Sequence, residues 1–337
     1  MRVLRSRTLH WLVALPLSGV LLYYSLRGVE WEQVGALLAT VRPGWLALGW
    51  SLAGFAVLLR SMRWRVLLGA QGEAPLPAVF WATSAGYFGN NFLPARAGEL
   101  VRTFMISACT PLSRTYVLTT GLAERMADAV ALVAISAVVM LSGAFRPAWL
   151  GRAAVPFSAI AGGAVLAIAF VPQLEPAAQK LLRRLPFPPR VKEAAGQALA
   201  QIGLGLSGFH QPSRFLRFLG FTAVIWFADA TGSVMLSRAL GLSLSLPAAF
   251  LLISALGLSS ALPSTPGYVG VYQFVAVTVL VPFGFSRSDA IAFILFGQAA
   301  QYVLIATLGG LGFWQYRRLQ ISRTPAPALA ALATPHP

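Results

Sequence analysis

Long apolar runs, broken by short polar gaps, cover most of the chain. Runs of about 18 to 29 residues can cross a bilayer as helices. They predict full spans at residues 9–26, 44–68, 115–143, 153–171, 215–240 and 289–313. Shorter apolar segments lie at 76–92, 100–109, 246–262 and 267–285. The runs lack the alternation of a membrane β-barrel, so the pattern predicts an all-α polytopic membrane protein with about six full spans.

Composition agrees with this class. Hydrophobic residues make up 57% of the 337 residues and charged residues only 11%, whereas a soluble domain has about 25% charged residues. A water-soluble chain of this size could not bury so much apolar surface. The sequence therefore excludes a soluble protein.

The net charge of +16 comes from basic residues that lie largely in the gaps between apolar runs. This distribution is typical of cytoplasmic loops of inner membrane proteins and not of a nucleic-acid-binding surface. Basic residues gather at both chain ends, at Arg63 and Arg65, and in residues 172–213. We therefore expect an inner-membrane location, with both termini and a basic 172–213 loop in the cytoplasm. Residues 1–313 are expected to form one transmembrane domain, followed by a disordered tail, 314–337.

The four shorter segments form two pairs. The second span ends in the cytoplasm and the 115–143 span starts there, so residues 76–109 have to enter from the cytoplasm and return to it. The same reasoning makes 246–285 a hairpin that enters from the other side. We expect two re-entrant, broken-helix hairpins; two full spans at 246–262 and 267–285 are the alternative.

The bends of these hairpins share the motif Leu-Pro-x-x-x-Gly. It contains Pro94 and Gly98 in the first bend and Pro263 and Gly267 in the second. Interrupted hydrophobic segments at corresponding places in two halves are typical of inverted-repeat transporters, which bind substrate near the interruptions. The motif suggests such a repeat, and a chance recurrence in a Leu- and Pro-rich chain is the alternative.

The first bend carries a dense polar cluster. Asn90 and Asn91 can cap backbone groups, and if residues 95–106 are helical one face presents Arg96, Glu99 and Arg102. These side chains contain one guanidinium more than the carboxylate can neutralise. Beside a helix N-terminus, that guanidinium would suit a phosphate or another anion. The alternative is that the side chains reach cytoplasmic water at the interface.

Charged residues also lie deep within the 115–143 span. Glu124, Arg125 and Asp128 come about ten residues into it, which at ~1.5 Å per residue is near the bilayer centre. Groups at this depth cost about 2.5–3.5 kcal/mol each to insert, and they have to face the bundle or a cavity. They predict either a substrate or proton site or a structural ion-pair cluster.

Asp229 is a further intramembrane charge. It lies midway along the 215–240 span without a basic residue nearby in the sequence. Arg125 or Arg96 could pair with it across the bundle, and a neutral, hydrogen-bonded carboxyl group is the alternative.

The second bend has hydroxyl groups and helix-breaking residues instead of charges. Ser264 and Thr265 supply hydroxyls, and Tyr272 and Gln273 follow. Helix breaking and a narrow turn are expected of Pro263, Pro266, Gly267 and Gly270. These groups predict either a cavity lining or simple packing. The last span adds a polar stripe that we expect to face the bundle, namely Gln298, Gln301 and Tyr302.

Common enzyme motifs are missing from the sequence. It contains no G-x-S-x-G, P-loop, H-E-x-x-H or Asp-x-Asp element. Its longest predicted loop, about 42 residues, is too short for a catalytic domain. One cysteine, Cys109, excludes an internal disulfide, and the three histidines are scattered. We expect no metal and no cofactor, and we favour a transporter over an enzyme.

Three motifs together resemble one known family. The segments "GYFGNNFLPARAGELVR", "AERMAD" and "LPSTPGYVGVYQF" are similar to the lysylphosphatidylglycerol synthase transmembrane-region family, also called flippase-like domain proteins. The resemblance covers residues 10–315. The family's motif positions map onto Asn90, Pro94, Arg96, Gly98 and Glu99, then Glu124, Arg125 and Asp128, then Pro263, Pro266, Gly267 and Gly270. Relatives often have a Glu two residues after the last Gly, where this chain has Tyr272.

The resemblance implies lipid translocation. Full-length relatives add a cytosolic aminoacyl-transferase domain that makes lysylphosphatidylglycerol, and their membrane region is implicated in moving that lipid. This sequence contains no such domain, so we do not expect lysyl-lipid synthesis. We expect a flippase for a phospholipid or another phosphate-bearing lipid, with phosphate contacts from Arg96, Arg102 and Arg125. The alternative is an integral membrane enzyme of glycolipid or phospholipid modification.

Overall fold

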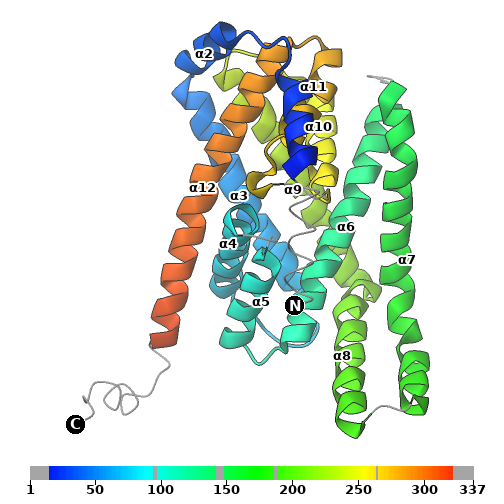
Figure 1. Ribbon diagram of the computed structural model, residues 1–337. Coiled ribbons are helices and arrows are strands. Elements are labelled where there is room, and N and C mark those ends of the chain that lie inside the picture. Colours follow the sequence, from blue (N-terminus) through cyan, green and yellow to red (C-terminus); the bar gives the residue numbers. More distant parts are fainter. Residues whose placement is uncertain (1–14, 94–96, 142–147, 186–187, 263–264, 322–337) are drawn as a thin grey trace.

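The structure is a computed structural model that describes residues 15–93, 97–141, 148–185, 188–262 and 265–321, and within these ranges every regular element is a helix (Figure 1). An N-terminal helix, Leu15–Leu26, precedes α2 (Trp31–Ala39), α3 (Pro43–Leu68), α4 (Leu76–Phe92), α5 (Gly98–Cys109) and α6 (Arg114–Leu141). The second half contains α7 (Ala148–Arg184), α8 (Pro189–Ser207), α9 (Pro212–Ala239), α10 (Leu246–Ser259), α11 (Val271–Leu280) and α12 (Arg287–Ile321). Short 3-10 turns are η2 (Gly208–His210), η3 (Pro266–Tyr268) and η4 (Val281–Phe283). The prediction of an all-α polytopic membrane protein is confirmed.

Helix length separates the membrane-spanning elements from the hairpins. Within the part of the chain that the structure describes, four helices are long and apolar enough to cross a membrane, namely α3, α9, α12 and the Ala161–Arg184 part of α7. α6 has 28 residues and is also long enough, although it carries charges in its middle. The predicted first span, 9–26, lies partly outside the described residues. The hairpin helices α4, α5, α10 and α11 have 17, 12, 14 and 10 residues, which is short of a full crossing.

The second half repeats the helix order of the first half. α3, α4, α5 and α6 correspond to α9, α10, α11 and α12, and the two members of each pair begin 169 to 173 residues apart. α3 and α9 both start with a proline in the first turn, and α4 and α10 both start with Leu-Pro. Proline suits the first helical turn because its missing N–H has no partner there. The shared order and starts support the predicted internal repeat.

Packing between the halves is reciprocal, as an inverted repeat requires. α6 packs on α10, and α12 packs on α4. α3 packs along α9 with Gly49 against Gly232, while the Arg63 guanidinium lies 4.9 Å from the ring centre of Phe218. An early residue of each helix thus meets a later residue of the other. The two equivalent helices are therefore antiparallel.

The bends of the two hairpins meet beside α12. The ring of Phe92, at the end of α4, lies 5.9 Å from the ring of Tyr302 on α12. The Tyr302 hydroxyl donates a hydrogen bond to the Gly267 carbonyl in the second bend. Figure 1 shows α4 and α5 in the lower part of the bundle and α10 and α11 in the upper part. The hairpins approach one another from opposite ends, as broken-helix hairpins should, while the predicted bend residues Pro94 and Pro263 lie outside the described residues.

Glycines make both bends possible. Gly267 and Gly270 have φ angles of 75° and 86°, a region that side-chain-bearing residues rarely adopt. A Cβ atom on Gly270 would clash with the Ser18 carbonyl, and one on Gly98 would clash with the Gly86 carbonyl. Pro266 starts the η3 turn.

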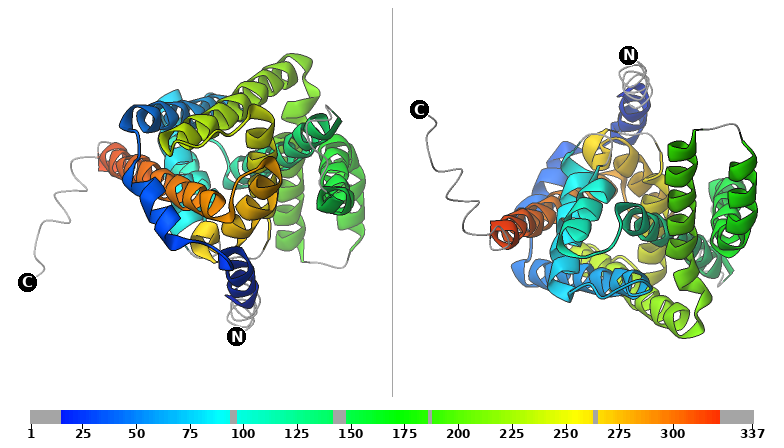
Figure 2. Two further views of the ribbon diagram at one scale, coloured as in Figure 1. Left: turned by 90° about the horizontal axis from the view of Figure 1, so that it is seen from above. Right: turned by 90° about the horizontal axis from the view of Figure 1, so that it is seen from below.

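Residues 172–213 are helical for most of their length, which corrects the predicted loop. α7 continues to Arg184 and α8 starts at Pro189, and the two helices lie side by side at the edge of the bundle (Figure 2). Prolines break the chain only locally there, because Pro189 occupies the first turn of α8. The short helix α2 was also not predicted, since nine residues give too little periodicity.

The last helix corrects the predicted start of the disordered tail. α12 continues to Ile321, so residues 314–321 are helical. Gln, Arg and Leu, which are abundant there, favour helix even where the apolar run has ended. Residues 322–337 lie outside the described residues.

Candidate functional site

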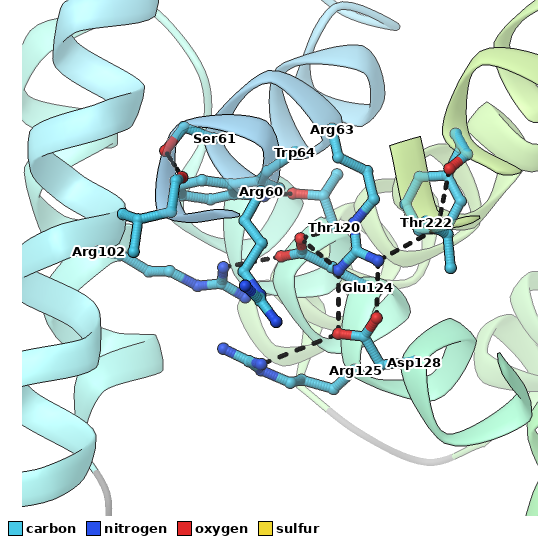
Figure 3. A network of polar contacts seen from close by, with 12 residues as sticks. Arg60, Ser61, Arg63, Trp64, Arg102, Thr120, Glu124, Arg125, Asp128 and Thr222 are labelled. Atoms are coloured by element: carbon cyan, nitrogen blue, oxygen red, sulfur yellow. Dashed lines mark hydrogen bonds and ion pairs between the residues drawn. The ribbon is translucent and has the colours of Figure 1, made fainter. Parts of the chain in front are cut away.

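Arg63 of α3 lies at the centre of a buried cluster of charged side chains (Figure 3). Its Nη1 and Nη2 donate to the two carboxylate oxygens of Asp128 at 2.7 and 2.9 Å, and Nη2 also donates to Glu124 Oε1 at 3.0 Å. Thr222 of α9 accepts a further hydrogen bond from Nη1 at 3.1 Å. Because the Arg63 side chain is only 1% exposed, this fork joins α3, α6 and α9 inside the core.

Arg102 of α5 is a second buried guanidinium. It donates to Glu124 Oε2 at 2.8 Å and forms an ion pair with Glu99 one turn away. Its guanidinium lies 4.4 Å from the ring centre of Trp64. Both oxygens of Glu124 are thus taken by arginines from two different helices. Arg102 positions the carboxylates and is not accessible to a ligand.

Arg125 of α6 is accessible by contrast. Its side chain is 38% exposed, against 4% for Arg102. Its Nε donates to Glu99 Oε1 at 3.0 Å, whereas its Nη1 lies 3.9 Å from Asp128 Oδ2, too far for a hydrogen bond. The terminal nitrogens of Arg125 therefore keep donors that the described residues do not use.

Arg60 and Asp229 form a separate ion pair between the two halves. They lie 169 residues apart, on the equivalent helices α3 and α9. Arg60 Nη1 lies 3.4 Å from Asp229 Oδ1, and Nη2 makes a closer contact with Oδ2. The prediction that Arg125 pairs with Asp229 is wrong, because Arg60 forms the ion pair with Asp229 across the α3–α9 contact. The other predicted partner, Arg96, lies outside the described residues. The Arg60 guanidinium also lies 5.6 Å from the Trp226 ring centre.

These charges border a cavity of about 690 Å³ within the bundle, a volume that suits a small organic group. Its charged lining consists of Arg60, Glu99, Arg125, Asp128 and Asp229. Uncharged polar side chains from α12 and the second bend include Tyr268, Tyr272, Gln298, Gln301 and Tyr302. Apolar residues of α3, α9, α10 and α12 complete the lining. The cavity therefore offers charged groups, neutral polar groups and apolar side chains to one ligand.

Neutral side chains hold the second bend. The Gly270 N–H donates to Gln273 Oε1 at 2.7 Å, and Gln273 Nε2 donates to Gln298 Oε1 at 2.6 Å. Gln298 Nε2 donates in turn to the Gly267 carbonyl at 2.9 Å. Gln273 is 2% exposed, so it braces the backbone and does not face the cavity.

A family comparison now adds to this geometry. The family described as the lysylphosphatidylglycerol synthase TM region matches residues 11–309. The chain belongs to this family. The match covers both halves of the repeat and the whole charged cluster, and it confirms the resemblance of the three motifs. No curated protein and no solved structure gives a match. Membership of the lysylphosphatidylglycerol synthase TM family links the chain to the modification or flipping of membrane lipids.

The three family motifs converge on the cavity. Seven of the predicted site residues line it: Asn90, Asn91, Glu99, Arg125, Asp128, Asp229 and Tyr272. Arg102 and Glu124 lie behind it in the buried cluster. Thr265 and Gln273 lie at the second bend but do not line the cavity, and the Thr265 hydroxyl donates to the Val269 carbonyl at 3.2 Å. Arg96 and Ser264 lie outside the described residues.

Two arginines of α3 were missed as site residues. From the sequence, Arg63 is expected to be a cytoplasmic flanking charge, and no role is assigned to Arg60. Their position in the sequence could have identified them as site residues. Both lie within an apolar run that continues to Leu68, whereas a charge that flanks a membrane span comes after the end of the run. Their spacing of three residues also places them on one helix face.

The charges of the site are balanced in number. Four guanidiniums, from Arg60, Arg63, Arg102 and Arg125, meet four carboxylates, from Glu99, Glu124, Asp128 and Asp229. Glu99 and Glu124 neutralise Arg102, whereas Arg96, the other arginine of the first bend, lies outside the described residues, so the surplus guanidinium expected there stays a prediction. Accessibility, and not excess charge, distinguishes Arg125 from its neighbours.

Proposed function

We propose that this protein moves a phosphate-bearing lipid between the leaflets of the membrane. The observation that carries the proposal is one cavity whose lining joins the accessible Arg125 guanidinium to many apolar side chains. Family membership supports a lipid as the ligand. The headgroup would lie against Arg60 and Arg125, and the acyl chains along the apolar side chains of α9, α10 and α12.

Unused donors favour a phosphate among the lipid groups. Arg125 has terminal nitrogens without hydrogen bonds to the described residues. The Nε1–H of Trp226, on the cavity wall, is buried and also has no partner among them. Buried donors without an acceptor are rare in folded proteins, and phosphate oxygens accept strong hydrogen bonds from guanidinium groups. Arg102, which we first placed at the phosphate, is buried and forms ion pairs with Glu99 and Glu124.

The inverted hairpins support movement across the bilayer. Inverted repeats with broken helices allow a central site to open alternately to either side. Two ion pairs at the cavity join different helices, Arg60–Asp229 between α3 and α9 and Arg125–Glu99 between α6 and α5. We propose that a lipid phosphate competes for these guanidiniums, so that binding loosens the contacts that hold the cavity closed.

For the location, we propose a cell inner membrane with both termini in the cytoplasm. The support is the distribution of arginine and lysine residues. They gather at the start and end of the chain and at the junction of α7 and α8, where the sequence has Lys180, Arg183, Arg184, Arg190 and Lys192. Such residues are enriched on the cytoplasmic side of membrane proteins.

A vesicle assay tests the proposed function. The purified protein would be reconstituted with tail-labelled fluorescent phosphatidylglycerol, and exchange between leaflets would be followed by dithionite quenching. We expect transport by the wild type and a loss of about tenfold or more in Arg125→Gln, since a charge-assisted hydrogen bond is lost. Arg114→Gln, on the same helix but exposed and outside the cavity, is the control. Equal transport in vesicles with and without protein, or an unaffected Arg125→Gln, would contradict the proposal.

A further inference from the structure

The two halves of the repeat present different chemistry to the cavity. When α6 and α12 are aligned at their first residues, Arg125 corresponds to Gln298 and Asp128 to Gln301. Aligning α5 with α11 places Tyr272 at the position of Glu99. Three charged positions of the first half, Glu99, Arg125 and Asp128, are thus replaced by a phenol and amides in the second, whereas Arg60 corresponds to the charged Asp229. A pseudo-symmetric cavity has become chemically asymmetric.

The wall built by α10, η3, α11 and α12 carries no charged residue among those described. Its polar members are Ser260, Tyr268, Tyr272, Gln298, Gln301 and Tyr302. The Gln298 amide already donates a hydrogen bond to the Gly267 carbonyl in the second bend, whereas the exposed amide of Gln301 makes no hydrogen bond to the described residues. All charged lining residues lie on the facing wall, on α3, α5, α6 and α9.

We propose that the lipid headgroup has two parts, a phosphate and an uncharged, hydroxyl-rich group such as a polyol or a sugar. The inference rests on the proposed function and specifies its substrate class. The phosphate lies against Arg60 and Arg125, and the hydroxyl groups lie against Gln301 and the tyrosines of the second bend. An amide offers both donors and an acceptor, which matches the hydrogen bonding of a hydroxyl group.

The wall fits a neutral group better than a cationic amine. An amine placed there would have no carboxylate on that wall to balance its charge. The rings of Tyr268 and Tyr272 stack with centroids 4.5 Å apart and planes 8° apart, so each ring covers one face of the other. An aromatic cage for a quaternary ammonium needs open ring faces around the cation, which this stacked pair does not provide.

Binding of short-chain lipids to the purified full chain tests this inference. The probes are dioctanoyl phosphatidylglycerol and phosphatidylinositol, compared with dioctanoyl phosphatidic acid, phosphatidylethanolamine and phosphatidylcholine. Wild type should bind the two hydroxylated lipids most tightly. Gln301→Leu should weaken them about fivefold, the scale of one lost hydrogen bond, while leaving phosphatidic acid unchanged. Gln315→Leu, the same change on the same helix outside the cavity, should bind all lipids as wild type does.

The outcomes separate the two proposals. If Gln301→Leu weakens phosphatidic acid as much as phosphatidylglycerol, or if the amine lipids bind most tightly, the headgroup inference is wrong while the phosphate site stands. If Arg125→Gln binds all five lipids as wild type does, the phosphate site itself is wrong. Thermal unfolding of each variant in detergent identifies any that lose binding because they unfold.

Discussion

The hairpin of α4 and α5 and the hairpin of α10 and α11 fix their bends in the same way but with different surroundings. In the first, the Gly98 N–H donates to the side-chain oxygen of Asn90 at 3.0 Å. In the second, the Gly270 N–H donates to the side-chain oxygen of Gln273 at 2.7 Å. Charged residues of α5 and α6 surround the first bend, whereas amides and a phenol surround the second.

The difference shows that bending a helix here does not require charge. In the described part of the second bend, the Gly267 and Gly270 backbone groups are satisfied by neutral side chains, which avoids the cost of burying ions. The charged groups around the first bend therefore need another explanation, and a charged ligand in the adjoining cavity supplies it. Stability experiments can separate the two bends by what each loses when its central side chain is removed.

The largest effect is expected from Arg63→Met. The change leaves Glu124 and Asp128 buried with one positive charge too few, and removing one partner of a buried ion pair costs about 3–5 kcal/mol. Thermal unfolding in detergent should show a large loss of stability or a failure to fold. Arg65→Met, two residues later and exposed, is the matched control and should change little.

A double variant distinguishes charge from packing at this position. Arg63→Met combined with Asp128→Asn restores charge balance, so it should recover part of the stability that Arg63→Met loses. If the double variant is as unstable as the single one, lost packing and not an unpaired carboxylate is the cause. An unpaired buried charge would then not explain why Arg63→Met costs more stability than a change at the neutral second bend.

An intermediate effect is expected from Gln273→Leu at the second bend. The change leaves the buried Gly270 N–H without its acceptor, which costs about 1–3 kcal/mol, but it leaves no unpaired charge. Gln273→Glu tests the same contrast, because the acceptor is kept while a negative charge is added. If Gln273→Glu is as stable as wild type in detergent unfolding, the second bend tolerates charge and the two bends are less different than we infer.

The sequence predicted the fold better than it predicted the ion pairs. Apolar runs and helix-breaking residues gave the hairpins to within a few residues, because both signals are local. α4, for example, matches the predicted segment 76–92. The sequence predicts the 153–171 part of α7 as a span, but it predicts a loop where the end of α7 and all of α8 are helical, since prolines and basic residues occur both in loops and at helix ends.

Ion-pair partners were harder to predict because they depend on how helices pack. Arg63 and Glu124 are 61 residues apart and Arg60 and Asp229 are 169 apart, so no local spacing could join them. The local pairs within α5 and α6 were foreseeable from helical periodicity. Burial was not foreseeable either, and it alone distinguishes the inaccessible Arg102 from the accessible Arg125.

The smallest effect is expected at the pair that joins the two halves. Arg60 and Asp229 are 16% and 21% exposed and border the cavity, where water can solvate the remaining charge, so Arg60→Gln or Asp229→Asn should cost less stability than Arg63→Met, whose cluster is fully buried. Because the two residues occupy equivalent positions of the repeat, the swapped variant Arg60→Asp with Asp229→Arg should re-form the pair and recover stability. Phosphate-lipid binding should fall all the same, because the guanidinium now projects from α9 instead of α3 and no longer points in the same direction toward Arg125. Recovery of both stability and binding would show that α3 and α9 are interchangeable at this position, and that the asymmetry between the two halves of the repeat lies with Arg125 and Gln301 alone.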